Sequence, residues 1–237
     1  MTSAVTRQNT VVECRGLTFG YKDSELFNNL SFEVSCNGFY SLVGKSGIGK
    51  TSLARIIEGE LHGWSADRLV VPEQILYAHD QERLPVWQTV GEHYRQVARE
   101  YHWDEITQIA EAFELDDEIL QKPGRKLSSG QLDRVNLIRY LSQSWDLLIL
   151  DEALANVDEI TRYTILSTVK ELLDPGTTLI YITHHLVEAI AFSKKIILLC
   201  ENERVNTRLI DGLDLNHFCP NDISQTKETF SRIIEAA

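Results

Sequence analysis

The sequence predicts an α/β fold in which a mostly parallel sheet carries helices on both faces. Three observations lead to this prediction. Short apolar runs recur along the 237-residue chain, and helical patterns lie between several of them. A glycine-rich segment at residues 44–52 joins one such run to one such helical pattern. Strands that alternate with helices are typical of parallel sheets whose faces are both covered.

The elements follow one another in a regular order after two strands that lie close together near the N-terminus. Closely spaced strands favour antiparallel pairing, so we expect an antiparallel β portion there. The predicted strands are 11–19, 30–34, 39–43, 68–71, 74–78, 147–150, 177–182 and 195–199. Helical periodicity predicts helices over 51–58, 159–173, 186–192 and 226–237, and a further strand is expected after Arg204.

Residues from about 90 to 141 contain helical patterns and no strand-like run. This block interrupts the alternation of strands and helices. We therefore expect a single domain, 1–237, in which 1–84 and 143–237 form the core and 85–142 form an inserted α-helical subdomain.

Composition excludes several classes of function. The chain has 23 basic and 35 acidic residues, a net charge of -12, so we expect no broad nucleic-acid-binding surface. No run approaches the ~20 apolar residues that span a bilayer, and the N-terminus lacks the apolar core of a signal peptide. The four cysteines show no CxxC spacing, which is typical of reduced cysteines in a cytosolic protein.

The segment GKSGIGKT, residues 44–51, fits the pattern G-x-x-x-x-G-K-[ST]. Its glycines permit a tight loop whose N–H groups face anionic oxygens, and the following helix adds the positive end of its dipole. We expect Lys50 to reach the β- and γ-phosphates and Thr51 to bind Mg²⁺. A fortuitous glycine turn is the alternative, and the flanking strand and helix argue against it. The predicted nucleotide-binding residues of this loop are Gly44, Lys45, Ser46, Gly47, Ile48, Gly49, Lys50, Thr51 and Ser52.

Two acids end the apolar strand LLILDE, residues 147–152. Carboxylates at the carboxyl end of a buried strand are costly unless they face a ligand. We expect Asp151 to hold Mg²⁺ and Glu152 to polarise the attacking water. The alternative interpretation is that both acids lie in a solvated turn after the strand. The presence of a phosphate-binding loop in the same chain argues against this interpretation.

The segment LSSGQ, residues 127–131, precedes an amphipathic helix and predicts a second phosphate-binding helix terminus. One nucleotide does not need two such ends, so the second end would complete the site of another subunit. This segment, with Arg134 in the helix after it, resembles the LSGGQ signature of the ATP-binding cassette (ABC) ATPases. The resemblance implies a P-loop NTPase core. It also implies that Ser128, Ser129, Gly130 and Gln131 contact the ATP of the partner subunit.

Further segments extend the resemblance along almost the whole chain. Tyr21 matches the aromatic residue that stacks on adenine in this family. The segment ALANVDE after Glu152 resembles the D-loop, with Asp158 as its acid, and His184 in YITHH matches the switch histidine that contacts the γ-phosphate. His185 would be its non-catalytic neighbour. Catalytic roles therefore fall to Glu152, His184, Lys50 and a Q-loop residue.

The Q-loop is the weakest match. In the family, a glutamine follows the strand after the first helix and touches Mg²⁺ and the water. Gln81 is our prediction on chemical grounds, but it requires a two-residue deletion, and a gap-free alignment on the proline places His79 there instead. Ser129 and Ala153 also depart from the usual glycine and proline, and neither departure removes a charged catalytic group.

The resemblance implies an ATP- and Mg²⁺-dependent ATPase subunit of an ABC transporter, similar to the nitrate, sulfonate and taurine importers. The implied partners are a second ABC ATPase subunit, identical or paralogous, a separate transmembrane permease and, for import, a periplasmic or lipoprotein substrate-binding protein. The implied location is the cytoplasmic face of the cell membrane. The alternative is a soluble ABC ATPase of the iron–sulfur cluster assembly type. A non-hydrolysing scaffold is disfavoured by the intact Glu152 and His184.

Overall fold

The computed structural model describes residues 10–22, 24–35, 37–79, 84, 87–98, 103–202 and 204–210, with side chains to residue 199. Within these residues a six-stranded sheet forms the centre of the molecule, in the order β5-β6-β7-β3-β8-β9. Its first five strands are parallel, and β9 pairs antiparallel with β8. The strands are β3 (Gly38–Val43), β5 (Ile75–His79), β6 (Leu147–Asp151), β7 (Thr178–Ile182), β8 (Lys195–Asn202) and β9 (Arg204–Ile210).

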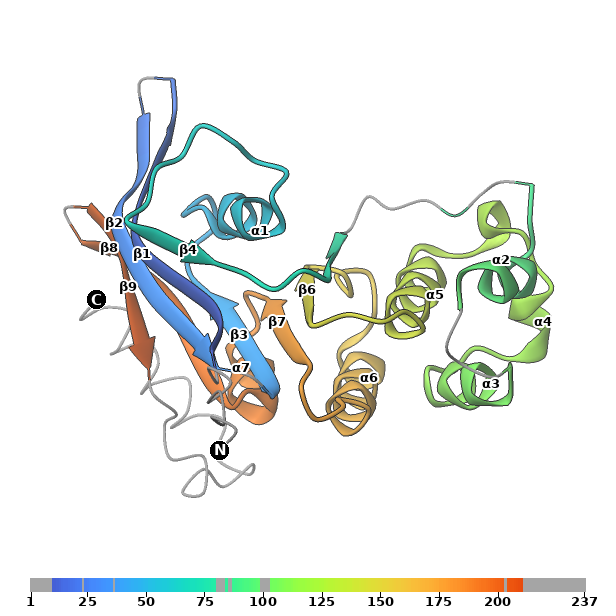
Figure 1. The fold of residues 1–237 in the computed structure, drawn as a ribbon. Helices are drawn as coiled ribbons and strands as arrows, with labels where there is room; N and C mark the ends of the chain where they lie inside the picture. Colours follow the sequence, from blue (N-terminus) through green and yellow to red (C-terminus); the bar gives the residue numbers. More distant parts are fainter. Residues whose placement is uncertain are drawn as a thin grey trace, which may run out of the picture.

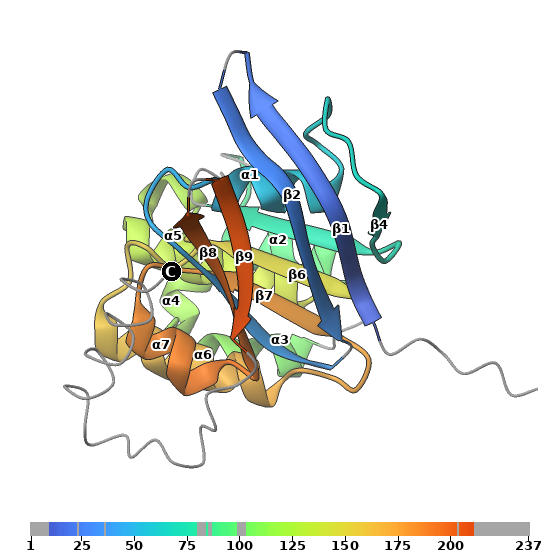
Figure 2. The same cartoon turned by 90° about the vertical axis from the view of Figure 1, so that its left-hand side faces the viewer.

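A second, three-stranded sheet is antiparallel, in the order β2-β1-β4. Its strands are β1 (Thr10–Tyr21), β2 (Ser24–Ser35) and β4 (Arg68–Val70). Strands β1 and β2 form a long hairpin that extends beyond the central sheet (Figure 2). The antiparallel β portion expected at the N-terminus is therefore present.

The central sheet separates two apolar cores because successive side chains along a strand point to opposite faces. On β6, Leu147 and Ile149 pack into the core shared with the three-stranded sheet and α1 (Lys50–Glu58). Leu148 and Leu150 pack into the other core, with α6 (Glu159–Glu171), α7 (Leu186–Phe192) and the helices that follow β5. A strand buried on both faces explains the continuous apolar run in the sequence.

Among the described residues, four helices and one short 3₁₀ turn lie between β5 and β6, although these two strands are hydrogen-bonded neighbours. They gather at one end of the molecule, away from the β1–β2 hairpin (Figure 1). They are α2 (Val90–Val97), α3 (Trp103–Ala112), α4 (Asp117–Leu120), the turn η1 (Gly124–Lys126) and α5 (Ser129–Leu141). The division of the chain into a core and an inserted helical subdomain over 85–142 stays a prediction.

The predicted α/β fold is confirmed, and most elements begin and end within one or two residues of the predicted bounds. The main difference is β2, which starts at Ser24, well before the predicted 30. The expected helix over 226–237 lies outside the described residues. None of the described helices is both long and apolar enough to cross a membrane.

Candidate functional site: a nucleotide pocket at the carboxyl edge of the sheet

A pocket of about 530 Å³ opens where β3, β5 and β6 end. Such an edge is the usual place for ligands in parallel α/β sheets. The lining comes from the hairpin, the glycine-rich loop, α1 and the ends of β5 and β6. The lining residues are Tyr21, Leu26, Ser46, Gly47, Gly49, Lys50, Thr51, Ser52, Arg55, Tyr77, His79, Asp151 and Glu152.

The glycine-rich loop needs glycine at the position that begins the helix. Gly49 is the N-cap of α1 and has φ 107°, in the left-handed region that only glycine adopts freely. A Cβ atom on Gly49 would lie 2.8 Å from two ring carbons of Phe27. The absence of a side chain at Gly49 therefore lets the loop lie close against the β1–β2 hairpin.

Lys50 is held at the centre of this loop. Its side chain is folded back so that Nζ donates hydrogen bonds to the carbonyl oxygens of Gly44, at 2.9 Å, and Lys45, at 3.0 Å. Burial lowers the pKa of Lys50, and the nearby Glu152 and Asp151 carboxylates oppose that effect. The ammonium group thus lies between the loop and the two acids, where a triphosphate would need a positive charge.

The two predicted acids differ in their surroundings. Asp151 is buried, and its Oδ2 accepts a 2.8 Å hydrogen bond from the Tyr77 hydroxyl. Glu152 is the first residue after β6 and has φ 51°, an unusual conformation for a residue with a side chain. Backbone strain of this kind often accompanies a functional position. Its carboxylate lines the pocket and is half exposed.

The predicted switch histidine lies beside Glu152. His184 Nδ1 is 3.5 Å from Glu152 Oε1. The His184 and His185 rings lie 4.1 Å apart, and the His185 backbone N–H donates to the Thr183 hydroxyl. Burial lowers the pKa of His185. The structure therefore places His184 next to the acid that sequence reasoning assigned to the attacking water.

Tyr21, the expected adenine-stacking residue, is the last residue of β1 and lines the pocket. It is half exposed, its ring contacts Phe19 edge-on, and its hydroxyl is 3.0 Å from Ser52 Oγ. Its contact with α1 keeps an aromatic surface beside the loop.

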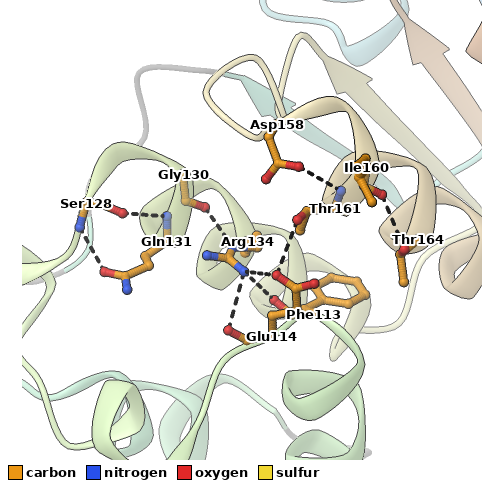
Figure 3. A network of polar contacts seen from close by, with 10 residues as sticks. All are labelled: Phe113, Glu114, Ser128, Gly130, Gln131, Arg134, Asp158, Ile160, Thr161 and Thr164. Atoms are coloured by element: carbon orange, nitrogen blue, oxygen red, sulfur yellow. Dashed lines mark hydrogen bonds and ion pairs between the residues drawn. The ribbon is translucent and has the colours of Figure 1, made fainter.

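The predicted signature residues are not among the described residues that line this pocket. Ser128 is the N-cap of α5, and it forms a capping box with Gln131 at 3.2 and 3.0 Å (Figure 3). Gly130 lies against the Asn156 carbonyl, where an added Cβ would be 2.8 Å from the oxygen. Asp133 Oδ2 accepts hydrogen bonds from the Asn156 backbone N–H and its side-chain amide.

Asp158 of the predicted D-loop caps α6 by accepting a hydrogen bond from the Thr161 backbone N–H. This bond is the main reason that the pKa of Asp158 is lowered. Arg134 joins α5 to Phe113 through a 2.8 Å hydrogen bond, and Glu114 accepts from the Thr161 hydroxyl (Figure 3). The helix after the predicted signature and the start of α6 thus belong to one network of polar contacts (Figure 3).

The pocket fits Mg²⁺ bound together with phosphates. No group of three or more His, Cys, Asp or Glu side chains that could hold a metal occurs in the described part of the chain. Mg²⁺ in nucleotide sites usually has one or two protein ligands, with phosphates and waters completing the octahedron. The Thr51 hydroxyl and the Asp151 carboxylate both line the pocket and supply oxygen ligands of that kind.

Sequence reasoning missed three lining residues, Leu26, Arg55 and Tyr77. Arg55 lies four residues after Thr51 on α1, so helical spacing could have indicated it. Tyr77 lies two residues before His79 and shares its face of β5. Gln81, our predicted Q-loop residue, lies outside the described residues, whereas His79 lines the pocket.

Comparisons with known proteins agree with this geometry. The ABC transporter family model matches residues 27–155. An aliphatic sulfonates import ATP-binding protein of Yersinia pestis is 30% identical over 217 residues, covering 88% of this chain and 77% of that protein. A nickel import ATP-binding protein of Escherichia coli is 26% identical, covering 82% of each. A bacterial Atm1-family ABC exporter with ATP bound matches with a TM-score of 0.75 and 25% identity, over 99% of this chain and 43% of that chain.

Proposed function

The chain belongs to the ABC transporter family, and from this premise we propose that it is the ATP-hydrolysing subunit of an importer. In this proposal two copies, or this chain and a paralogue, dimerise around two ATP molecules. These subunits bind at the cytoplasmic face of the membrane and drive the transport of solute through a separate membrane permease. The import direction rests on similarity to proteins whose names describe import ATP-binding subunits of sulfonate, Fe(3+) and nickel systems.

One observation supports dimerisation in this proposal. The pocket contains the phosphate-binding loop, Asp151 and Glu152, whereas the Ser128 end of α5 is not part of its described lining. That helix end presents N–H groups and the positive end of a helix dipole, which suit a phosphate. A second copy facing this one would bring its own α5 to the pocket and complete the site.

The proposal assigns roles to several groups in and beside the pocket. Catalysis of phosphoryl transfer depends chiefly on positioning and charge stabilisation. Lys50 and the loop N–H groups bind the β- and γ-phosphates. Glu152 and His184 orient the attacking water, and Tyr21 contacts adenine. Mg²⁺, held by Thr51 and Asp151, would neutralise charge on the phosphates. ATP binding closes the dimer because its γ-phosphate is contacted from both sides, and hydrolysis removes those contacts.

The test is to purify tagged Glu152→Gln protein from detergent-solubilised membranes in the presence of ATP. Slowed hydrolysis should hold the ATP-bound dimer closed. We expect a multi-span membrane protein in stoichiometric amount, identified by mass spectrometry. The matched control is the Glu152→Gln/Lys50→Ala protein, which should bind ATP weakly and show no ATP-dependent dimer.

A soluble ATP-dependent dimer without a membrane protein would contradict the transport part of the proposal. It would favour a soluble ABC ATPase instead. Absence of any ATP-dependent dimer would contradict the shared site itself.

A further inference from the structure

A second groove, of about 880 Å³, lies at the opposite edge of the central sheet from the nucleotide pocket. Gln74, Asp146 and Thr177, which immediately precede β5, β6 and β7, line it. We propose that this groove binds a basic, amphipathic helix of a partner protein. The groove shares no described lining residue with the nucleotide pocket, so the inference does not depend on the proposed ATPase function.

The walls of the groove come from two helices, α3 and α6, which contact each other (Figure 1). The wall from α3 is one face of that helix, because its residues follow the i, i+3, i+4, i+7 spacing. They are Glu105, Gln108, Ile109 and Ala112. The last turn of α6 supplies Thr168 and Glu171, and Leu172 is its C-cap.

Apolar side chains from three segments lie along the groove. They are Ile109 from α3, Trp145 from the segment between α5 and β6, and Leu172 from the end of α6. Leu172 is 37% exposed, and Trp145 packs only partly against the core. An apolar groove between helices is the surface that an amphipathic helix binds. No strand residue belongs to the described lining, so the groove offers no free strand edge to an extended peptide.

The charged side chains of the groove are all of one sign. The described lining contains no Lys, Arg or His, and its four acids are Glu105, Asp146, Glu171 and Asp174. Helices α5 and α6 also end at the groove, and the C-terminal end of a helix dipole is negative. The basic residues of these last turns, Arg139 and Lys170, are not part of the described lining.

This charge selects among the possible occupants. A helix with Lys or Arg beside its apolar face would pair with the acids while its apolar side chains contact Ile109, Trp145 and Leu172. The chain itself carries 35 acidic and 23 basic residues. A partner with a basic segment therefore complements the groove better than a second copy of this chain does.

The test uses the full chain and a fluorescein-labelled peptide of about 14 residues, roughly four helical turns, with leucine on one face and lysine beside it. Fluorescence anisotropy measures its affinity. We expect binding at low salt that weakens as the salt concentration rises, because exposed ion pairs are screened. A matched peptide with glutamate at every lysine position should not bind.

Two groove variants separate the charges from the apolar contact. Glu171→Gln/Asp174→Asn should weaken binding of the lysine peptide about three- to tenfold and reduce its salt dependence. Leu172→Gln should weaken binding while the salt dependence remains. The matched control, Glu25→Gln/Glu58→Gln, removes the same charge from exposed acids outside the described lining, and its affinity should stay within about twofold of the parent. Circular dichroism checks that each variant is folded.

Four outcomes would overturn the inference. They are absence of binding by the lysine peptide, equal binding of the two peptides, unchanged affinity in the Glu171/Asp174 variant, and unchanged affinity in the Leu172 variant. Spermidine, a polycation without an apolar face, is the probe for the last case. If it bound as tightly as the peptide, the groove would be a site for small cations and not for a helix. None of these measurements involves ATP, so their failure is distinct from failure of the proposed function.

Discussion

Arg162 and Glu188 form an ion pair that is closed to solvent. Arg162 Nε lies 2.5 Å from Glu188 Oε1, and both side chains are less than one-tenth exposed. Arg162 Nη1 also donates to the Val157 carbonyl, and the Tyr181 hydroxyl donates to Glu188 Oε2, each at 2.8 Å. The pair therefore joins the segment before Asp158 to the strand and helix on either side of His184.

Removing one partner of this pair should be costly, because the other would remain buried without its counter-charge. We expect Arg162→Met to lower the free energy of unfolding by about 3–5 kcal/mol. The double variant Arg162→Met/Glu188→Leu should recover part of this loss. Urea denaturation followed by circular dichroism measures both, and a loss below about 1 kcal/mol in the single variant would show that the pair is not energetically important.

Glu152→Gln should remove the carboxylate that we propose orients the attacking water, while keeping the size of the side chain. We expect the ATPase rate to fall by about 10²–10⁴-fold, in the range for general acid–base catalysis, with ATP affinity retained. Phosphate release measures the rate. Glu159→Gln, an exposed acid in the first turn of α6, is the control and should keep the parental rate.

Two glycines of the phosphate-binding loop should respond differently to a methyl group. Gly47 and Gly49 both have positive φ, but a Cβ on Gly47 meets no atom within 4 Å, whereas one on Gly49 meets Phe27. We expect Gly47→Ala to cost about 1–2 kcal/mol of unfolding free energy from backbone strain alone. Gly49→Ala should cost more. Equal losses in chemical denaturation would contradict the close packing against Phe27.

Ser128→Ala should separate the role of this residue as a cap from the contact with a partner's phosphate that we propose for it. Loss of an N-cap costs about 1 kcal/mol of stability. We expect that loss together with weaker ATP-dependent dimerisation, measured by analytical ultracentrifugation in the Glu152→Gln background. Asp116→Ala removes the N-cap hydrogen bond of α4 and should cost similar stability without affecting the dimer. Normal dimerisation of the Ser128 variant would argue against a phosphate contact.

His93 on α2 should make the protein sensitive to mild acid. Its side chain is 8% exposed, Nε2 has no hydrogen-bond partner among the described residues, and burial lowers its pKa from 6.5. The unfolded chain therefore takes up a proton at a higher pH than the folded one. Stability is lost as the pH falls through 6.5, until the folded state also protonates. His93→Gln should show a shallower decline in urea midpoint below pH 7, and parallel curves would contradict this.

The sequence predicts the parts of the site that are local in the chain. The loop at Gly49 and Lys50 and the acids Asp151 and Glu152 each belong to a short segment whose chemistry can be recognised alone. Arg55 and Tyr77 were not predicted. Arg55 reaches the pocket because of its position around the axis of α1, and Tyr77 because it lies on the same face of β5 as His79. The choice between His79 and Gln81 depends on the register of β5 against β6, which sequence spacing does not determine.

Long-range pairs are harder still to predict. Arg162 and Glu188 lie on different helices, and the patterns around each one indicate only an amphipathic helix. Their pairing follows from how α6 and α7 pack on the sheet. The predicted helix bounds were nevertheless close, because caps such as Asp158 are local signals that act within one turn.

The strand order also determines when the pocket can form during synthesis. Strand β3, which leads into the phosphate-binding loop, pairs on one side with residues 178–182 and on the other with residues 195–198. Contacts between segments so far apart form slowly because a long loop must close first. The loop emerges from the ribosome early, but its strand has no neighbour in the sheet until residues 178–182 have been made. A nascent chain shorter than this should bind nucleotide poorly, and its unpaired β3 is where association with other chains would begin.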